Sequence, residues 1–416
     1  MTVKLPRSIS PLAERNFRLL WIGQTASAAG DSLVNVALAF AALSITHSAT
    51  GLGSVLAVSI IANVFGLPIG GVWADRLPRQ LVMLGSDGVR ALAQASIGIT
   101  LITGTARLWE LLAYAVVFNA AGGFFQPAAS SVVSQTVSAA RLQQANALMG
   151  LSRSTTGVIG PAVAGVLVAV FGPGWVFLID AVTFLVSALS LALLRIPTLA
   201  AKARRSFFAE LADGLRAVTS RRWYVMNLAG HAMWNFAIAA FFVLGPIVAK
   251  EKLGGASAWG LISASLGIGA VSGGLVALRV TPKRPLVVAN LALAPAALQL
   301  LSLAVPMPVV VIMATCVVGW AGLTFLNEVW FATVPQLIPQ EVLARATSFD
   351  WLLSIIAMPI GFAVSGPVAD HIGIPTTLVI AAGVLVLACG FIILIPGVRK
   401  VRRTGDGTIV LEGVAV

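Results

Sequence analysis

The chain has 416 residues, of which 58% are hydrophobic and only 10% are charged, and its mean hydropathy is +0.96. A water-exposed surface needs many more charged side chains, so this composition excludes an ordinary soluble protein and favours a chain that faces lipid. The formal net charge is +12, yet no basic patch is interleaved with aromatic residues, so nucleic acid is not an expected partner.

Twelve apolar segments follow one another along the chain, each close to the ~20 residues that a membrane-crossing helix needs. The predicted spans are 17–44, 51–74, 81–103, 111–133, 145–171, 175–194, 224–249, 256–278, 286–304, 308–334, 347–369 and 375–395. We therefore predict an all-α membrane protein with five parts: an N-terminal segment 1–16, a six-helix bundle 17–194, a linker 195–223, a second six-helix bundle 224–395 and a tail 396–416.

Lysine and arginine are distributed unevenly between the predicted loops. If both termini are cytoplasmic, only Arg107, Lys250 and Lys252 fall on the outer side, and Arg90 and Arg153 fall within spans. This asymmetry predicts a multi-pass protein of the cell membrane with cytoplasmic termini, whose basic loops contact anionic lipid headgroups. Apolar residues recur at helical spacing in the linker, which predicts an amphipathic helix lying along the membrane surface.

The first helix of each bundle carries polar residues at a spacing that places them on one face. They are Gln24, Ser27, Asp31 and Asn35 in the first span, and Asn227, His231 and Asn235 in the seventh. Such a face predicts a water-filled substrate pathway, for which the further candidates are Asn119, Gln126, Trp234 and Asn327.

Three ionisable residues lie well inside predicted spans, namely Asp31, Arg153 and Glu328. A charge at membrane depth is costly unless it is paired or hydrated, so each is a candidate for function. We expect Arg153 to pair with Asp31, either to stabilise the fold or to contact substrate. Asp31 and Glu328 are candidates for proton coupling, and a structural hydrogen-bonding role is the alternative for each.

The two bundles also resemble each other in sequence. At one constant offset, Gln135 aligns with Gln336, and Gly160, Gly165 and Gly172 align with Gly361, Gly366 and Gly373. Parallel repeats of this kind are typical of transporters whose halves rock about a central site.

The segment from Gly71 through Asp75, Arg76 and Arg79 resembles the cytoplasmic signature of the major facilitator superfamily, with Pro78 where that signature usually has glycine. In that family Gly71 would allow close helix approach, and the charged residues would form a gate with the eleventh helix. The resemblance implies a cytoplasmic gate of Gly71, Asp75, Arg76, Arg79 and Asp350. Asp87 and Arg90, three residues apart at the start of the third helix, are expected either to form a local pair or to belong to this gate.

The fifth helix contains Gly160, Pro161 and Gly165 in a pattern that resembles the superfamily's export signature. The segments 16–21, 124–128, 145–148 and 179–184 resemble the drug:proton antiporter branch that includes macrolide efflux proteins and the enterobactin exporter. An arginine that some of those relatives use for proton exchange is missing from the fourth span, so the proton mechanism does not carry over.

These observations predict a secondary exporter of amphipathic or lipophilic small molecules, such as drug, macrolide-like or siderophore-like cargo, that exchanges cargo for protons. Import of a small metabolite and a non-transporting membrane sensor are the alternatives. No phosphate-binding glycine loop and no metal-ligand cluster occurs in the sequence, so we expect neither an enzyme nor a cofactor. A monomer is expected.

Overall fold

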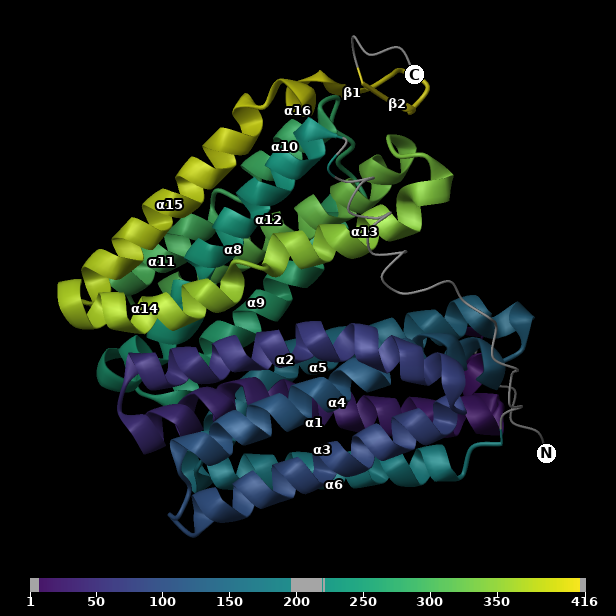
Figure 1. Cartoon of the computed structure of the whole chain (residues 1–416), viewed down its shortest axis with the longest axis vertical. Coiled ribbons are helices and arrows are strands. Elements are labelled where there is room, and N and C mark those ends of the chain that lie inside the picture. The colour runs from purple at the N-terminus through teal and green to yellow at the C-terminus, as the bar shows by residue number, and fades with distance from the viewer. Residues whose placement is uncertain (1–6, 196–218, 220, 412–416) are drawn as a thin grey trace. The chain divides into compact units, whose positions relative to one another are not determined.

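The computed structural model describes residues 7–195, 219 and 221–411 and is almost entirely helical in this part of the chain (Figure 1). Most of the predicted linker lies outside the described residues. The membrane-length helices of the first half are α1 (Arg15–Thr46), α2 (Ala49–Arg76), α3 (Arg79–Ile102), α4 (Leu108–Thr136), α5 (Leu142–Phe171) and α6 (Pro173–Ala192).

The second half also occupies all of its predicted spans, although two of them are divided into shorter helices. Its helices are α8 (Arg222–Val248), α9 (Ala256–Ala277), α10 (Pro285–Leu291), α11 (Ala296–Ala304), α12 (Val309–Thr333), α13 (Gln340–Ile355), α14 (Met358–Ile372) and α15 (Ile374–Leu394). Short helical turns at Arg7–Ala13, Ala139–Arg141, Ala249–Leu253 and Val334–Gln336 adjoin these helices. The predicted twelve-span architecture is confirmed.

Within the described residues, eleven segments are long and apolar enough to cross a membrane by themselves. The span that falls short is α3, because it carries Asp87, Arg90 and Gln94, all of which are buried in the structure. A helix with charged and amide side chains at its centre depends on its neighbours to pair them. In the first unit α3 packs against α4 and α6.

The chain forms two compact units. The first contains α1–α6 together with 255–264, and the second contains α8 and the rest of the chain from 265 onward. The turns that follow α5 and α14 are equivalent in the two halves, because Gly172 has φ +85° and Gly373 has φ +84°. Only glycine adopts this backbone conformation readily, which explains why the repeat retains glycine here.

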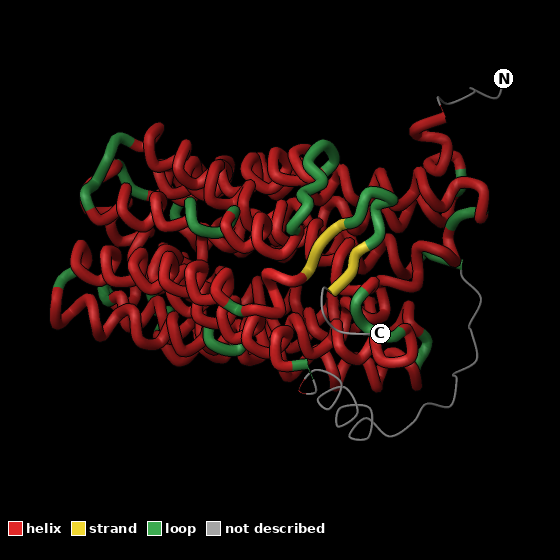
Figure 2. The backbone as a smooth tube through the Cα atoms, turned by 90° about the horizontal axis from the view of Figure 1, so that it is seen from above, coloured by secondary structure: helices red, strands yellow, loops and turns green. Residues whose placement is uncertain are grey.

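The predicted tail is a folded element. The short helix α16 (Pro396–Lys400) leads into an antiparallel hairpin of β1 (Val401–Arg403) and β2 (Ile409–Leu411), drawn yellow in Figure 2. Hydrogen bonds from Thr404 and Thr408 in its turn hold the pKa of Asp406 below its ordinary value.

The hairpin is held to the second unit by burial and by backbone hydrogen bonds. Val401 and Ile409 are buried in the same apolar cluster as Leu286 and Ile392. The Arg403 N–H donates to the Lys283 carbonyl at 2.9 Å, and the Ile409 N–H donates to Gln336 Oε1 at 3.1 Å. The hairpin therefore ties the α9–α10 connection to the turn after α12.

We predict that Ile409→Asp detaches the hairpin without unfolding the helices, because a buried carboxylate without a partner is strongly unfavourable. Limited proteolysis should then cleave within 401–411, while the protein still elutes as a single gel-filtration peak. Val410→Asp is the matched control, because Val410 is 40% exposed on the same strand. Equal protease resistance of both variants would show that Ile409 does not hold the hairpin.

Candidate functional site

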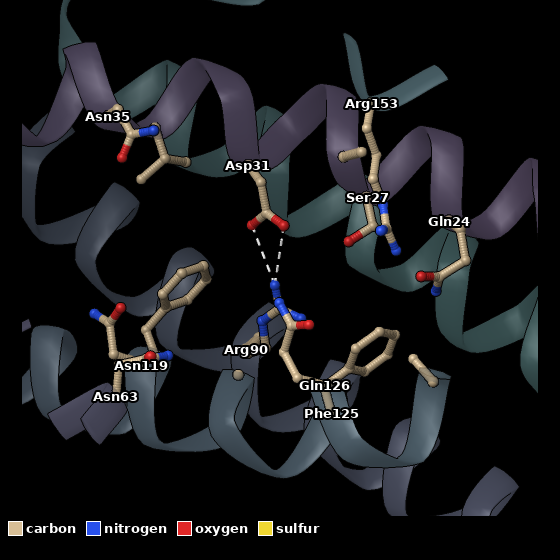
Figure 3. Close-up of a pocket in the computed structure, with 15 residues that line it drawn as sticks. Gln24, Ser27, Asp31, Asn35, Asn63, Arg90, Asn119, Phe125, Gln126 and Arg153 are labelled. Atoms are coloured by element: carbon tan, nitrogen blue, oxygen red, sulfur yellow. Dashed lines mark hydrogen bonds and ion pairs between the residues drawn. The ribbon is translucent and has the colours of Figure 1, made fainter. Parts of the chain in front are cut away.

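The first unit contains a cavity of about 420 Å³ with walls from α1, α2, α3, α4 and α5 (Figure 3). Its aromatic members are Phe118 and Phe125. The polar members are Gln24, Ser27, Asp31, Asn35, Asn63, Arg90, Asn119, Gln126 and Arg153. Amides and hydroxyls can both donate and accept hydrogen bonds, so this wall suits an oxygen-rich molecule.

All four polar residues of the predicted α1 face line this cavity. The face lies against the interior because α1 packs through its other residues against α5 and α6. Trp21 and Thr25 donate hydrogen bonds to Ser152 Oγ at 3.0 and 3.1 Å, which joins α1 to α5 at the edge of the cavity. Helical spacing in the sequence therefore identified this wall.

Asp31 pairs with Arg90, and the expected pairing with Arg153 is wrong. Arg90 Nη2 lies 3.2 Å from Asp31 Oδ1 and 3.1 Å from Oδ2. Arg90 is buried near the middle of α3, so it belongs to the cavity wall and was misplaced in the predicted gate. The error arose because spacing along one helix does not reveal which neighbouring helix approaches it.

Arg90 is held by more than one carboxylate. Its Nη1 lies 3.6 Å from Asp87 Oδ1, and the Asp87 side chain is fully buried, so the two residues form the local pair that was one of the two expectations for them. The guanidinium stands 4.1 Å from the centre of the Phe184 ring and 5.1 Å from that of Phe118. Aromatic faces attract a cation, so ion pairs and rings together stabilise the charge away from water.

A third carboxylate lies beside this cluster. Asp180 of α6 is fully buried and accepts hydrogen bonds from Gln94 Nε2 and from Thr183 Oγ1. A Cβ added at Gly30 would lie 1.9 Å from Asp180 Oδ1, so glycine is required there for the carboxyl group to fit. Neither Asp180 nor Gln94 was predicted as a site residue. A charged residue within a predicted span was the signal that could have identified Asp180.

Arg153 lines the same cavity without a carboxylate partner. In Figure 3 it extends into the cavity on the side of Ser27 and Gln24, away from the dashed lines that join Arg90 to Asp31. Among the residues that the structure describes, the ion pairs are Asp31–Arg90, Asp87–Arg90 and Glu14–Arg141. Arg153 therefore presents an unneutralised guanidinium to the cavity.

The predicted gate residues at the α2–α3 turn are described only in part. Arg76 ends α2 and is exposed, and Arg79 begins α3, but the side chain of Asp75 lies outside the described residues. A Cβ added at Gly71 would meet no atom within 4 Å, whereas one at Gly70 would lie 2.4 Å from Phe124 Cα. The close approach expected at Gly71 is thus made by its neighbour, Gly70.

The Gly160, Pro161 and Gly165 pattern lies in a tightly packed part of α5. A Cβ at Gly160 would lie 1.8 Å from Ser32 Oγ, and one at Gly165 would lie 2.9 Å from Gly260 Cα in the same unit. The helix continues through Pro161. Small residues here permit close helix contact, which is the structural property expected of this pattern.

The second unit contains a smaller cavity of about 120 Å³. Its walls include five predicted site residues, His231, Trp234, Asn235, Asn327 and Asp350. Asp350 is 8% exposed and accepts a hydrogen bond from Trp330 Nε1, so within this unit it belongs to the cavity wall instead of the predicted gate surface.

Asn227 and Glu328, two further residues predicted in the second unit, differ in burial. Asn227 is fully buried and forms part of a neutral network: Asn290 Nδ2 donates to Asn227 Oδ1 at 3.2 Å, and Asn290 Oδ1 lies 3.0 Å from His231 Nε2. Asn290 was not identified, because a lone asparagine in an apolar run gives no periodic signal. Glu328 is exposed and lines neither cavity.

We predict that Arg90→Gln lowers the stability of the purified protein by about 3 kcal/mol, because it leaves buried carboxylates without their cation. Adding Asp87→Asn should restore more stability than adding Asp31→Asn, since Asp87 is fully buried while the Asp31 side chain is 40% exposed. Thermal denaturation in detergent measures both effects.

Arg279→Gln, at an exposed position after α9, is the control for loss of one positive charge. An Arg90→Gln variant as stable as this control would contradict a stabilising role for the ion pairs.

Comparison with known proteins identifies the family. Residues 7–405 match the model of the transmembrane secretion effector family of the major facilitator superfamily. Macrolide efflux protein A of Streptococcus pyogenes is 23% identical over 395 residues, which cover 93% of this chain and 96% of that protein. Multidrug efflux pump Tap of Mycolicibacterium fortuitum is 24% identical over 413 residues, which cover 92% of this chain and 96% of that protein.

A solved structure of the nucleoside transporter NupG superposes with a TM-score of 0.72 over 91% of this chain and 98% of that chain, at 17% identity. At this identity the likeness establishes the fold alone. Together with the family match over nearly the whole chain, it leads to one conclusion: the chain belongs to the transmembrane secretion effector family and is a multi-pass transporter of the major facilitator type.

Proposed function

We propose that the protein exports amphipathic small molecules from the cell in exchange for protons, by alternating access of its two halves. The names of its relatives, a macrolide efflux protein and a multidrug efflux pump, support export of drug-like cargo. The Gly160, Pro161 and Gly165 pattern of α5, which resembles the superfamily's export signature, also supports export over import. A location in the cell membrane as a monomer, with both termini cytoplasmic, accords with the basic inner loops.

The cavity of the first unit is the proposed cargo pathway. Its volume of about 420 Å³ lies within the usual size of a small-molecule site, and it combines amides with two phenyl rings. In the second unit, the cavity lined by His231, Trp234 and Trp330 is proposed to contact cargo as well.

The shared guanidinium of Arg90 is the observation that carries the proton part of the proposal. Asp31 lies on the cavity wall, where water and protons can reach it, and Asp87 is buried on the other side of Arg90. When Asp31 takes up a proton it loses its charge, and Arg90 keeps Asp87 as its partner. Cargo binding would then favour one state of Asp31 over the other, which couples the two fluxes.

Glu328 has no part in this mechanism. It is exposed and forms no ion pair within the described part of the chain. Among the two acidic candidates from the sequence, Asp31 is the one that the geometry supports.

We predict that Asp31→Asn abolishes proton-driven transport while membrane insertion is retained, because asparagine cannot exchange a proton. The assay uses inside-out membrane vesicles with an acidic lumen and measures accumulation of a radiolabelled macrolide and of a catecholate siderophore. Wild-type vesicles should accumulate at least one of them, and the variant should fall to the level of vesicles lacking the protein.

Glu251→Gln is the matched control, since Glu251 is an exposed carboxylate after α8. Full gradient-driven accumulation by Asp31→Asn would refute the proton role of Asp31. If vesicles preloaded with the two labelled compounds lose both of them under the same gradient, and do not accumulate either, the result would instead indicate import.

A further inference from the structure

The cavity of the first unit has two arginines and one carboxylate on its wall, and a second carboxylate, Asp87, lies buried against Arg90. The charged members of the wall are Asp31, Arg90 and Arg153, and Arg90 already neutralises Asp31. We propose that Arg153 is a recognition residue that binds an acidic group on the cargo, so that amphipathic anions are the preferred substrate class. This inference rests on the proposed transport function and specifies its cargo.

Asp31 is not available as a partner for Arg153. Both of its carboxylate oxygens lie 3.1–3.2 Å from Arg90 Nη2. In the described residues, no carboxylate lies within ion-pair distance of Arg153. The Arg153 side chain is exposed on the cavity wall, so its guanidinium is accessible to an acidic group on a molecule that enters the cavity.

The position of Arg153 is fixed by its neighbours in α5. Ser152, the preceding residue, accepts hydrogen bonds from Trp21 and Thr25 of α1 at 3.0 and 3.1 Å. These bonds join α5 to α1 one residue before Arg153, whose side chain extends into the cavity in Figure 3. The backbone of α5 that carries Arg153 is therefore anchored to α1 beside the cavity.

The rest of the wall suits the same class of molecule. Arg90 lies over the rings of Phe118 and Phe125, so those aromatic faces are already occupied by a cation. Amide groups from Gln24, Asn63 and Gln126 surround the space that remains. An organic cation would meet a second positive charge here, whereas a carboxylate, sulfonate or catecholate would meet the planar donor pair of Arg153.

The test uses a pair of probes that differ in one charge, cholate and its neutral methyl ester. Equilibrium binding of each radiolabelled probe is measured with the full-length protein in nanodiscs. Wild-type protein should bind cholate at least about tenfold more tightly than the ester, which is a modest effect for a charge-assisted hydrogen bond. Arg153→Gln should lose this preference by weakening cholate alone, and Arg153→Lys should keep part of it.

Arg279→Gln controls for the loss of a distant positive charge, and thermal denaturation of each variant controls for folding. Three results would each overturn the inference: the wild-type protein binds both probes equally, it binds neither probe, or Arg153→Gln keeps the preference for cholate. The proposed export function would survive any of these results, because the vesicle assay measures it independently with a macrolide and a siderophore.

Discussion

The first unit depends on one buried cation. Arg90 lies near the middle of α3 and is bonded to Asp31 of α1 and paired with Asp87 of its own helix. In a low-dielectric interior such charges are stable only when their partners are close and well oriented. The pairing explains how α3 can cross the membrane although its centre is polar, and it also determines which other charges in the cavity remain without a partner.

The two halves carry matching residues at a constant offset, yet their polar centres differ in kind. The first unit holds an ion-paired cluster, with Asp180 and Gln94 behind it. The second unit holds a neutral network of Asn227, His231 and Asn290 beside Asp350. We assign the proposed proton exchange to the first half because Asp31 shares Arg90 with Asp87 there.

Local sequence patterns predicted part of the site. Helical spacing was sufficient to place Gln24, Ser27, Asp31 and Asn35 on a cavity wall, because those positions depend only on one helix. The partner of Asp31 was missed, because it depends on how α1 and α3 pack, which no spacing within one helix encodes. The hairpin 401–411 was missed for a similar reason, since its burial comes from contacts with residues far away in the chain.

The central claim is that protonation of Asp31, beside Arg90, links cargo movement to proton movement. Proteoliposomes that contain a pH-sensitive dye, and that receive only a gradient of the macrolide or siderophore found to be transported, test it directly. As cargo enters through the wild-type protein, the lumen should become more alkaline, and with Asp31→Asn its pH should not change. Cargo entry through the wild-type protein without any change in luminal pH would contradict the claim.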